Sequence, residues 1–248
     1  MATAGPVALI TGGARRIGAS ITHALHRQHC RVIVHYRGSA EPAQRLIAAL
    51  NDQRPGSAIA LQADLGDPTA VCDLAARAGD AFGALDVLVN NASRFYPTPL
   101  AGADDHDWEA IMHSNLRAPF LLSQHLATAL AAGGGGAIVN LIDIYAEKPL
   151  LNHSLYCMAK AGLAMMTRSL ARELGPAVRV NGVAPGAVLW PEQGQPRQRD
   201  ILDAIALGRT GEPDEIAAAV AWLALHAPYV TGQILAVDGG RSLAFPGG

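Results

Sequence analysis

Residues 7–18 read VALITGGARRIG and give the clearest indication of the fold. The apolar run Val7–Ile10 is typical of a short buried strand, and a glycine-rich turn joins it to a helical pattern that begins at Ile17. Glycine lets the backbone approach a phosphate closely, and the unpaired N–H groups at a helix N-terminus favour an anion. The stretch therefore predicts a phosphate-binding turn. Taken alone, it is also compatible with an ordinary strand-to-helix turn.

Short apolar runs and longer helical stretches alternate along the chain, a pattern typical of a parallel sheet with helices on both faces. Strands are predicted at Val7–Ile10, Arg31–Tyr36, Ala58–Gln62, Val87–Asn90, Ala137–Leu141, Val178–Val183 and Ile234–Val237. Helices are predicted at Ile17–His29, Glu41–Asn51, Pro68–Ala81, Asp107–Ala131, Ser154–Leu174 and Pro213–His226. We therefore predict one α/β domain over residues 1–248, a Rossmann-type, doubly wound fold with a seven-stranded parallel sheet. Residues 191–207 are predicted to form an irregular, mobile loop that contacts substrate.

The composition excludes several classes of function. Half of the 248 residues are apolar, 16% are charged and the formal net charge is −2, which argues against nucleic-acid binding and disorder. Residues 118–142 contain no Asp, Glu, Lys or Arg, but four glycines at 133–136 interrupt them, so no membrane span is predicted. The three cysteines show no paired or metal-like spacing, which favours a reducing, cytoplasmic compartment.

His23, His26 and His29 recur at every third residue, which raises the question of a metal site. On a helix, steps of three residues drift by about 60° each, so the rings spread over about 120° and do not converge on one ion. The pattern predicts a solvated helix face, and the sequence predicts no metal site.

The end of the second predicted strand bears on the choice of cofactor. An NAD-binding chain usually places an acidic residue there against the ribose 2′-hydroxyl, but this chain has His35, Tyr36 and Arg37. Arg37 and Ser39, with an arginine of the first turn, could surround a 2′-phosphate. The sequence therefore favours NADPH over NADH, and solvated surface charges are the alternative interpretation.

Tyr156 and Lys160 are four residues apart in a predicted helix, so one turn places both side chains on the same face. A nearby ammonium group stabilises tyrosinate and lowers the phenol pKa, which would make Tyr156 a proton donor near neutral pH. This spacing is common by chance, and in isolation it indicates two surface residues.

The phosphate turn and the Tyr156/Lys160 pair occur together with Asn90-Asn91-Ala92, Asn115 and Pro185-Gly186. In this order and spacing, the motifs resemble the short-chain dehydrogenase/reductase family over nearly the whole chain. The resemblance implies a Rossmann-type domain that transfers a hydride from a nicotinamide, usually as a homotetramer or dimer. It also implies that Tyr156 delivers a proton, that Lys160 binds the nicotinamide ribose and that Asn115 holds a relay water.

Two departures narrow the resemblance. Most family members have glycine in place of Arg16 and serine in place of Asp143, thirteen residues before the tyrosine. With residues 35–37 (HYR) and 91–100 (NASRFYPTPL), these changes resemble the pteridine reductases of the family. That likeness implies that Asp143 assists the tyrosine, that Arg16 meets cofactor phosphate and pterin, and that Phe95 stacks on the pterin ring.

Elementary chemistry agrees with this assignment. Reducing a ring C=N bond needs a proton delivered to nitrogen, which a carboxyl group can hold and pass on. An ionised Asp143 would raise the pKa of Tyr156, so we expect this carboxyl group to be protonated or hydrogen-bonded in the loaded site. Phe95 offers a flat apolar face to a flat heterocycle. The alternative for Phe95 is packing under its own loop.

The expected sites follow from the resemblance. The cofactor site comprises Gly12, Arg15, Arg16, Ile17, Gly18, Tyr36, Arg37, Ser39, Asp64, Leu65, Asn91, Ala92, Ser93, Lys160, Pro185, Gly186 and Val188. The catalytic residues are Asp143, Tyr156, Lys160 and Asn115. The substrate site comprises Arg16, Ser93, Phe95, Asp143, Tyr156, Leu189 and Trp190.

The expected function is NADPH-dependent reduction of dihydropterin, with oxidised pterin and dihydrofolate as further substrates, to the tetrahydro form by a cytoplasmic homotetramer. Two alternatives stay open. One is a carbonyl reductase of the same family, of the 3-oxoacyl-carrier-protein reductase type, which Asp143 disfavours. The other is a non-catalytic dinucleotide-binding regulator, which the intact set of Tyr156, Lys160 and Asn115 disfavours.

Overall fold

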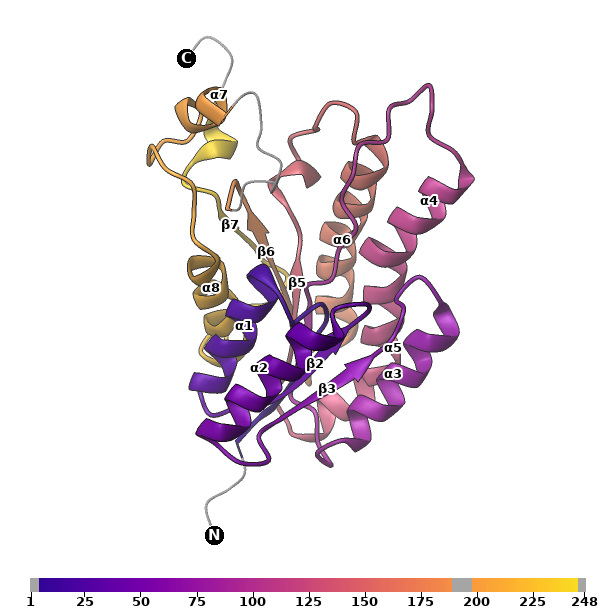
Figure 1. The fold of residues 1–248 in the computed structure, drawn as a ribbon, viewed down its shortest axis with the longest axis vertical. Coiled ribbons are helices and arrows are strands. Elements are labelled where there is room, and N and C mark those ends of the chain that lie inside the picture. Colours follow the sequence, from indigo (N-terminus) through magenta and orange to yellow (C-terminus); the bar gives the residue numbers. More distant parts are fainter. Residues whose placement is uncertain (1–4, 189–197, 245–248) are drawn as a thin grey trace.

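A computed structural model of the chain describes residues 5–188 and 198–244 (Figure 1). Seven parallel strands form one sheet in the order β3-β2-β1-β4-β5-β6-β7. They are β1 (Val7–Ile10), β2 (Arg31–Tyr36), β3 (Ala58–Gln62), β4 (Val87–Asn90), β5 (Gly136–Leu141), β6 (Val178–Pro185) and β7 (Ile234–Val237). The predicted fold class and its seven-stranded parallel sheet are confirmed.

Helices cover both faces of the sheet (Figure 1). They are α1 (Arg16–Arg27), α2 (Ala40–Gln53), α3 (Pro68–Asp80), α4 (Asp105–Met112), α5 (Ala118–Ala132), α6 (Ser154–Glu173), α7 (Gln198–Asp203) and α8 (Pro213–Leu225). In β1, Val7 and Leu9 pack with α3, α5 and α6, whereas Ala8 and Ile10 pack with α1, α2 and α8. Because both faces are buried, β1 is apolar at every position and does not alternate.

The strand order places the site. β1 pairs with β2 on one side and with β4 on the other, so the chain reverses its direction across the sheet between β1 and β4. Loops that leave the carboxyl ends of two such strands diverge to opposite faces and leave a crevice between them, where ligands bind in open parallel sheets.

The single helix predicted over residues 107–131 is interrupted in the structure. A π-helical turn, η1 (His113–Arg117), separates α4 from α5. Pro119 has no N–H to donate to the carbonyl group of Asn115 four residues earlier, and its ring crowds the preceding turn. The wider turn relieves this conflict, and it places Asn115 in a distorted segment of a kind that often occurs at functional sites.

Two further predictions needed correction. The predicted loop 191–207 is not irregular throughout, because residues 198–203 form α7. Its first part, residues 191–197, and the predicted substrate residues Leu189 and Trp190 lie outside the described residues. The solvated face predicted for the three histidines is wrong for His26, which is buried and whose Nε2 lies 2.7 Å from Ser57 Oγ. Within residues 5–188 and 198–244, each helix is too short or too polar to span a bilayer.

Candidate active site

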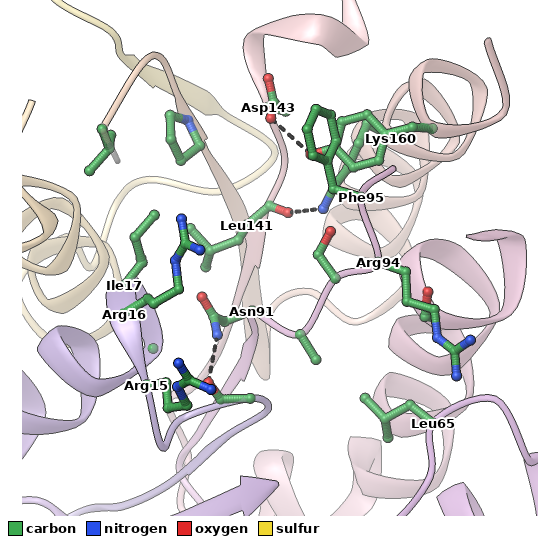
Figure 2. A pocket seen from close by; sticks show the side chains of 18 of the residues that line it. Arg15, Arg16, Ile17, Leu65, Asn91, Arg94, Phe95, Leu141, Asp143 and Lys160 are labelled. Atoms are coloured by element: carbon green, nitrogen blue, oxygen red, sulfur yellow. Dashed lines mark hydrogen bonds between the residues drawn. The ribbon is translucent and has the colours of Figure 1, made fainter. Parts of the chain in front are cut away.

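A cavity of about 1070 Å³ opens at the carboxyl ends of the strands (Figure 2). Every predicted cofactor and substrate residue that the structure describes lines it. Arg15, Arg16 and Asn91 lie at one end, and Asp143, Phe95 and Lys160 lie at the other. Asn115 does not line the cavity. The cavity is large enough for a dinucleotide and a small heterocycle together.

The first turn requires glycine for packing reasons. Gly12 has a φ of +61°, and a Cβ there would lie 3.2 Å from Ala92 Cα. A Cβ on Gly18 would lie 2.1 Å from the carbonyl oxygen of Gly12. Asn91 closes the turn, because its Nδ2 donates to the carbonyl oxygen of Thr11 at 2.8 Å and to that of Gly12 at 3.2 Å. The turn is therefore held tightly against the loop that follows β4.

Arg16 occupies a strained position at the start of α1. Its φ of +52° lies in the left-handed region that favours glycine, at a cost of about 1–2 kcal/mol for another residue. The first turn of α1 has no side-chain cap and no acidic residue, so its N–H groups face the cavity without an anionic neighbour from that turn. A helix N-terminus flanked by two arginines suits the pyrophosphate of a nicotinamide dinucleotide.

His35 is a supporting residue that the sequence analysis missed. Gly12 N–H donates to its Nδ1 at 3.1 Å, and its Nε2 donates to the carbonyl oxygen of Ala63 at 3.1 Å. The ring therefore joins the phosphate turn to the end of β3. Burial lowers the pKa of His35 to about 4, so the ring is neutral near pH 7 and can accept the glycine hydrogen bond.

This arrangement predicts a loss of stability in mild acid. In the unfolded chain, His35 has a pKa near 6.5, so below that pH the unfolded state binds a proton that the folded state excludes down to about pH 4. Between pH 7 and pH 5, the protein should lose about 2 kcal/mol of unfolding free energy through this residue. Urea unfolding should show a shallower pH dependence for His35→Gln, and an equal dependence would contradict the assignment.

The catalytic end joins α6 to the segment after β5. Tyr156 Oη donates to Asp143 Oδ2 at 2.8 Å, and the N–H of Tyr145 donates to Asp143 Oδ1 at 3.0 Å. Lys160 Nζ, one helical turn after Tyr156, donates to the carbonyl oxygen of Leu141 at 2.8 Å (Figure 2). Both carboxyl oxygens of Asp143 thus accept a hydrogen bond, and the state of this group in the loaded site stays a prediction.

Burial controls the ionisation of these groups. It raises the pKa of Asp143 above its usual value and lowers the pKa of Lys160 to about 8. Burial and the carboxylate of Asp143 raise the pKa of Tyr156 well above its usual value. This rise is opposite to the lowered pKa expected from Lys160, whose ammonium nitrogen lies 5.6 Å from the ring centre of Tyr156 and donates to the carbonyl oxygen of Leu141.

Asn115 lies behind the cavity wall, fully buried in η1. Its Oδ1 accepts from Ser93 Oγ at 2.7 Å, and its Nδ2 donates to the carbonyl oxygens of Arg94 and Ile111, each at 3.0 Å. The side chain therefore holds the loop after β4 against α4. The relay water assigned to Asn115 by resemblance stays a prediction.

Phe95 forms part of the cavity wall next to Tyr156. Its ring stacks on His153 with centroids 4.7 Å apart and meets Tyr156 edge-on at 4.8 Å. The ring is 50% exposed, so it is not sealed beneath its loop. His153, a second residue that the sequence analysis missed, supports it, and the ring of His153 is fixed in turn because Nδ1 donates to the carbonyl oxygen of Leu151 at 2.8 Å.

Comparison with known proteins gives the family. The sequence profile described as enoyl-(acyl carrier protein) reductase matches residues 12–242. The chain belongs to the short-chain dehydrogenase/reductase family. Members of this family are oxidoreductases that use a nicotinamide dinucleotide, and the open N-terminus of α1 and its arginines fit such a group.

Three relatives within the short-chain dehydrogenase/reductase family are similar over nearly the full length of both chains. Pteridine reductase 1 of Leishmania tarentolae is 38% identical, with 96% of each chain covered. Granaticin polyketide synthase putative ketoacyl reductase 2 of Streptomyces violaceoruber is 35% identical, again with 96% of each covered. The 3-oxoacyl-[acyl-carrier-protein] reductase of Synechocystis sp. is 34% identical, with 94% of this chain and 96% of the relative covered.

Proposed function

We propose that this short-chain dehydrogenase/reductase is an NADPH-dependent pteridine reductase. It would reduce dihydropterin to the tetrahydro form and accept oxidised pterin and dihydrofolate as further substrates. The observation that carries this proposal is the hydrogen bond of 2.8 Å between Asp143 and Tyr156, in a cavity that Phe95 also lines. The similarity to the Leishmania tarentolae pteridine reductase supports it.

The chemistry follows from the protonation states of the two side chains. A nicotinamide held by Lys160 and the turn after β1 would supply the hydride that reduces the carbon atom of the ring C=N bond. Tyr156 donates its phenolic proton to the ring nitrogen, and Asp143, which lies 2.8 Å away, passes a proton back to the phenolic oxygen. Burial of Asp143 favours the protonated carboxyl group that this step needs, because the ionised form is poorly solvated there.

The other side chains of the site hold the reactants. Arg16 would meet the cofactor phosphates and the pterin, Lys160 the nicotinamide ribose, and Phe95 the face of the pterin ring opposite the nicotinamide. An offset aromatic pair of this kind adds about 0.5–1.5 kcal/mol beyond burial. The His153 ring behind Phe95 would keep this wall in place when substrate enters.

A carbonyl reductase is the second candidate, because two of the relatives carry ketoacyl reductase names. Asp143 disfavours this candidate. A serine hydroxyl group can hydrogen-bond to the oxygen of a carbonyl substrate, whereas a carboxyl group can hold and pass on the proton that a ring nitrogen needs. NADPH consumption should be compared for dihydrobiopterin, dihydrofolate and an acetoacetyl thioester. We expect the dihydropterins to be reduced. Turnover of the thioester alone would establish the second candidate, and no turnover at all would indicate a non-catalytic dinucleotide-binding protein.

The cofactor choice gives a separate prediction. Arg37 follows β2 directly and lines the cavity together with Ser39. NADPH should therefore bind about tenfold to a hundredfold more tightly than NADH, because a charge-assisted hydrogen bond to the 2′-phosphate is worth about 1.5–3 kcal/mol. Fluorescence titration measures both affinities, and Arg37→Ala should narrow the ratio. Equal affinities of the unaltered protein for the two cofactors would refute the preference.

Assembly into a homotetramer is proposed from the apolar surface of two helices. Phe120 on α5 and Met158 and Met165 on α6 are 42%, 46% and 62% exposed. Burying such side chains between copies is favourable, and closed symmetry is usual for soluble oligomers. Sedimentation velocity at micromolar concentration should show a tetramer, and a monomer alone would contradict it. The three unpaired cysteines fit the cytoplasmic location proposed with it.

A further inference from the structure

Arg241 is a cation at the substrate end of the cavity that no sequence motif indicated. It follows β7, and it lines the same cavity as Asp143 and Tyr156. Its Nη2 donates to the hydroxyl group of Tyr145 at 3.0 Å, and its guanidinium carbon lies 5.5 Å from the centre of that ring. Arg241 is therefore held beside the residue whose N–H binds Asp143.

A well-defined turn carries Arg241. The carboxylate of Asp238 accepts from the N–H groups of Gly240 at 2.9 Å and Ser242 at 2.7 Å. Gly239 and Gly240 have φ values of +63° and +82°, a conformation that glycine adopts without strain. Because the backbone of Arg241 is already fixed, no backbone ordering is needed when its side chain binds a ligand.

Arg241 follows a strand well separated from those that carry the arginines expected at the cofactor phosphates. The phosphate turn follows β1 and Arg37 follows β2, whereas Arg241 follows β7. In the observed order, β7 is four strands from β1 and five from β2, or about 19 and 24 Å at about 4.8 Å per strand. Arg241 acts instead on Asp143: its positive charge lowers the pKa of this carboxyl group, whereas burial raises it.

The guanidinium group keeps donors for a ligand. Over residues 5–188 and 198–244, no carboxylate forms an ion pair with Arg241, whereas Arg94 in the same cavity lies 3.7 Å from the carboxylate of Asp64. The contact with Tyr145 uses one of five N–H donors. The planar fork of a guanidinium group matches a carboxylate with two parallel hydrogen bonds.

We propose that Arg241 binds a carboxylate on the side chain of the substrate. The enzyme should then prefer dihydropterins with an acidic side chain to those with a neutral one. This inference rests on the pteridine reductase activity proposed above, and it makes Arg241 a specificity-determining residue of that site.

The test compares two dihydropterins in matched variants. Dihydrofolate carries carboxylates at the end of its side chain, and dihydrobiopterin carries none. Arg241→Met should lower kcat/KM for dihydrofolate about tenfold to a hundredfold more than kcat/KM for dihydrobiopterin, and the difference should lie mainly in KM. Arg241→Lys should restore part of the loss, since it keeps the charge. Arg77→Met, which removes a surface cation paired with Asp73 on α3, should change neither substrate.

Each result separates this inference from the proposed function. If both dihydropterins are reduced and Arg241→Met lowers kcat/KM equally for both, or for neither, Arg241 does not recognise the side chain and the inference is wrong. If the unaltered enzyme oxidises NADPH with neither dihydropterin, the proposed function is wrong, and the inference that rests on it falls as well. Raised salt should increase KM for dihydrofolate alone.

Discussion

Tyr156→Phe should lower kcat for dihydropterin reduction by about 10²–10⁴-fold, the contribution of a positioned proton donor. The substitution removes the hydroxyl group that donates to Asp143 at 2.8 Å and keeps the ring that packs edge-on against Phe95. The affinity for NADPH should be unchanged, because the phosphate turn and α1 are untouched. Steady-state kinetics and fluorescence titration measure the two quantities separately.

A matched control is available on the surface. Tyr229 is fully exposed, so Tyr229→Phe removes a hydroxyl group without touching the cavity and should leave kcat at the wild-type value. If Tyr156→Phe keeps kcat within about tenfold of wild type, well short of the loss of a proton donor, another group delivers the proton. Asp143 would then be the first group to test in that role, because it is the hydrogen-bonding partner of Tyr156.

Asp143→Ser should lower kcat for dihydropterin by about 10²–10⁴-fold, because it removes the carboxyl group proposed to resupply the proton. It also restores the residue that most of the family has at this position, so weak reduction of an acetoacetyl thioester is expected to appear. A loss of dihydropterin reduction together with a gain of thioester reduction would show a change of substrate specificity, since general damage to the fold would lower both activities. The measurement is kcat for both substrates in the same preparation.

Asp143→Asn separates proton transfer from hydrogen bonding. The amide keeps an oxygen that can accept from Tyr156 and from the N–H of Tyr145, but it cannot supply a carboxyl proton. NADPH binding should persist and dihydropterin turnover should fall.

If Asp143→Ser leaves dihydropterin turnover within about twofold of wild type, the role of Asp143 is wrong and the preference for pterins over carbonyl compounds loses its physical basis.

Much of the fold followed from local sequence patterns. Strands β1, β2, β3, β4 and β7 have the predicted bounds, because each is a short apolar run between clear turns. The long helix was mispredicted because its apolar pattern continues through Asn115 and Pro119, and the pattern does not register a missing N–H. The solvated position predicted for His26 was wrong because its burial depends on a hydrogen-bonding partner, Ser57, that lies 31 residues later and that the helix pattern does not reveal.

The parallel sheet, the turn after β1 and the shared face of Tyr156 and Lys160 could all be predicted from the residues alone, since glycines, apolar periods and a four-residue spacing act over short distances along the chain. Only the tertiary structure brought Arg241 to Tyr145, which is 96 residues earlier, and joined His35 to Gly12 and Phe95 to His153. It also set the ionisation of Asp143 and Tyr156. Such contacts leave no local pattern, because they arise where loops from different strands meet at one edge of the sheet and where burial removes the water that would otherwise fix each pKa.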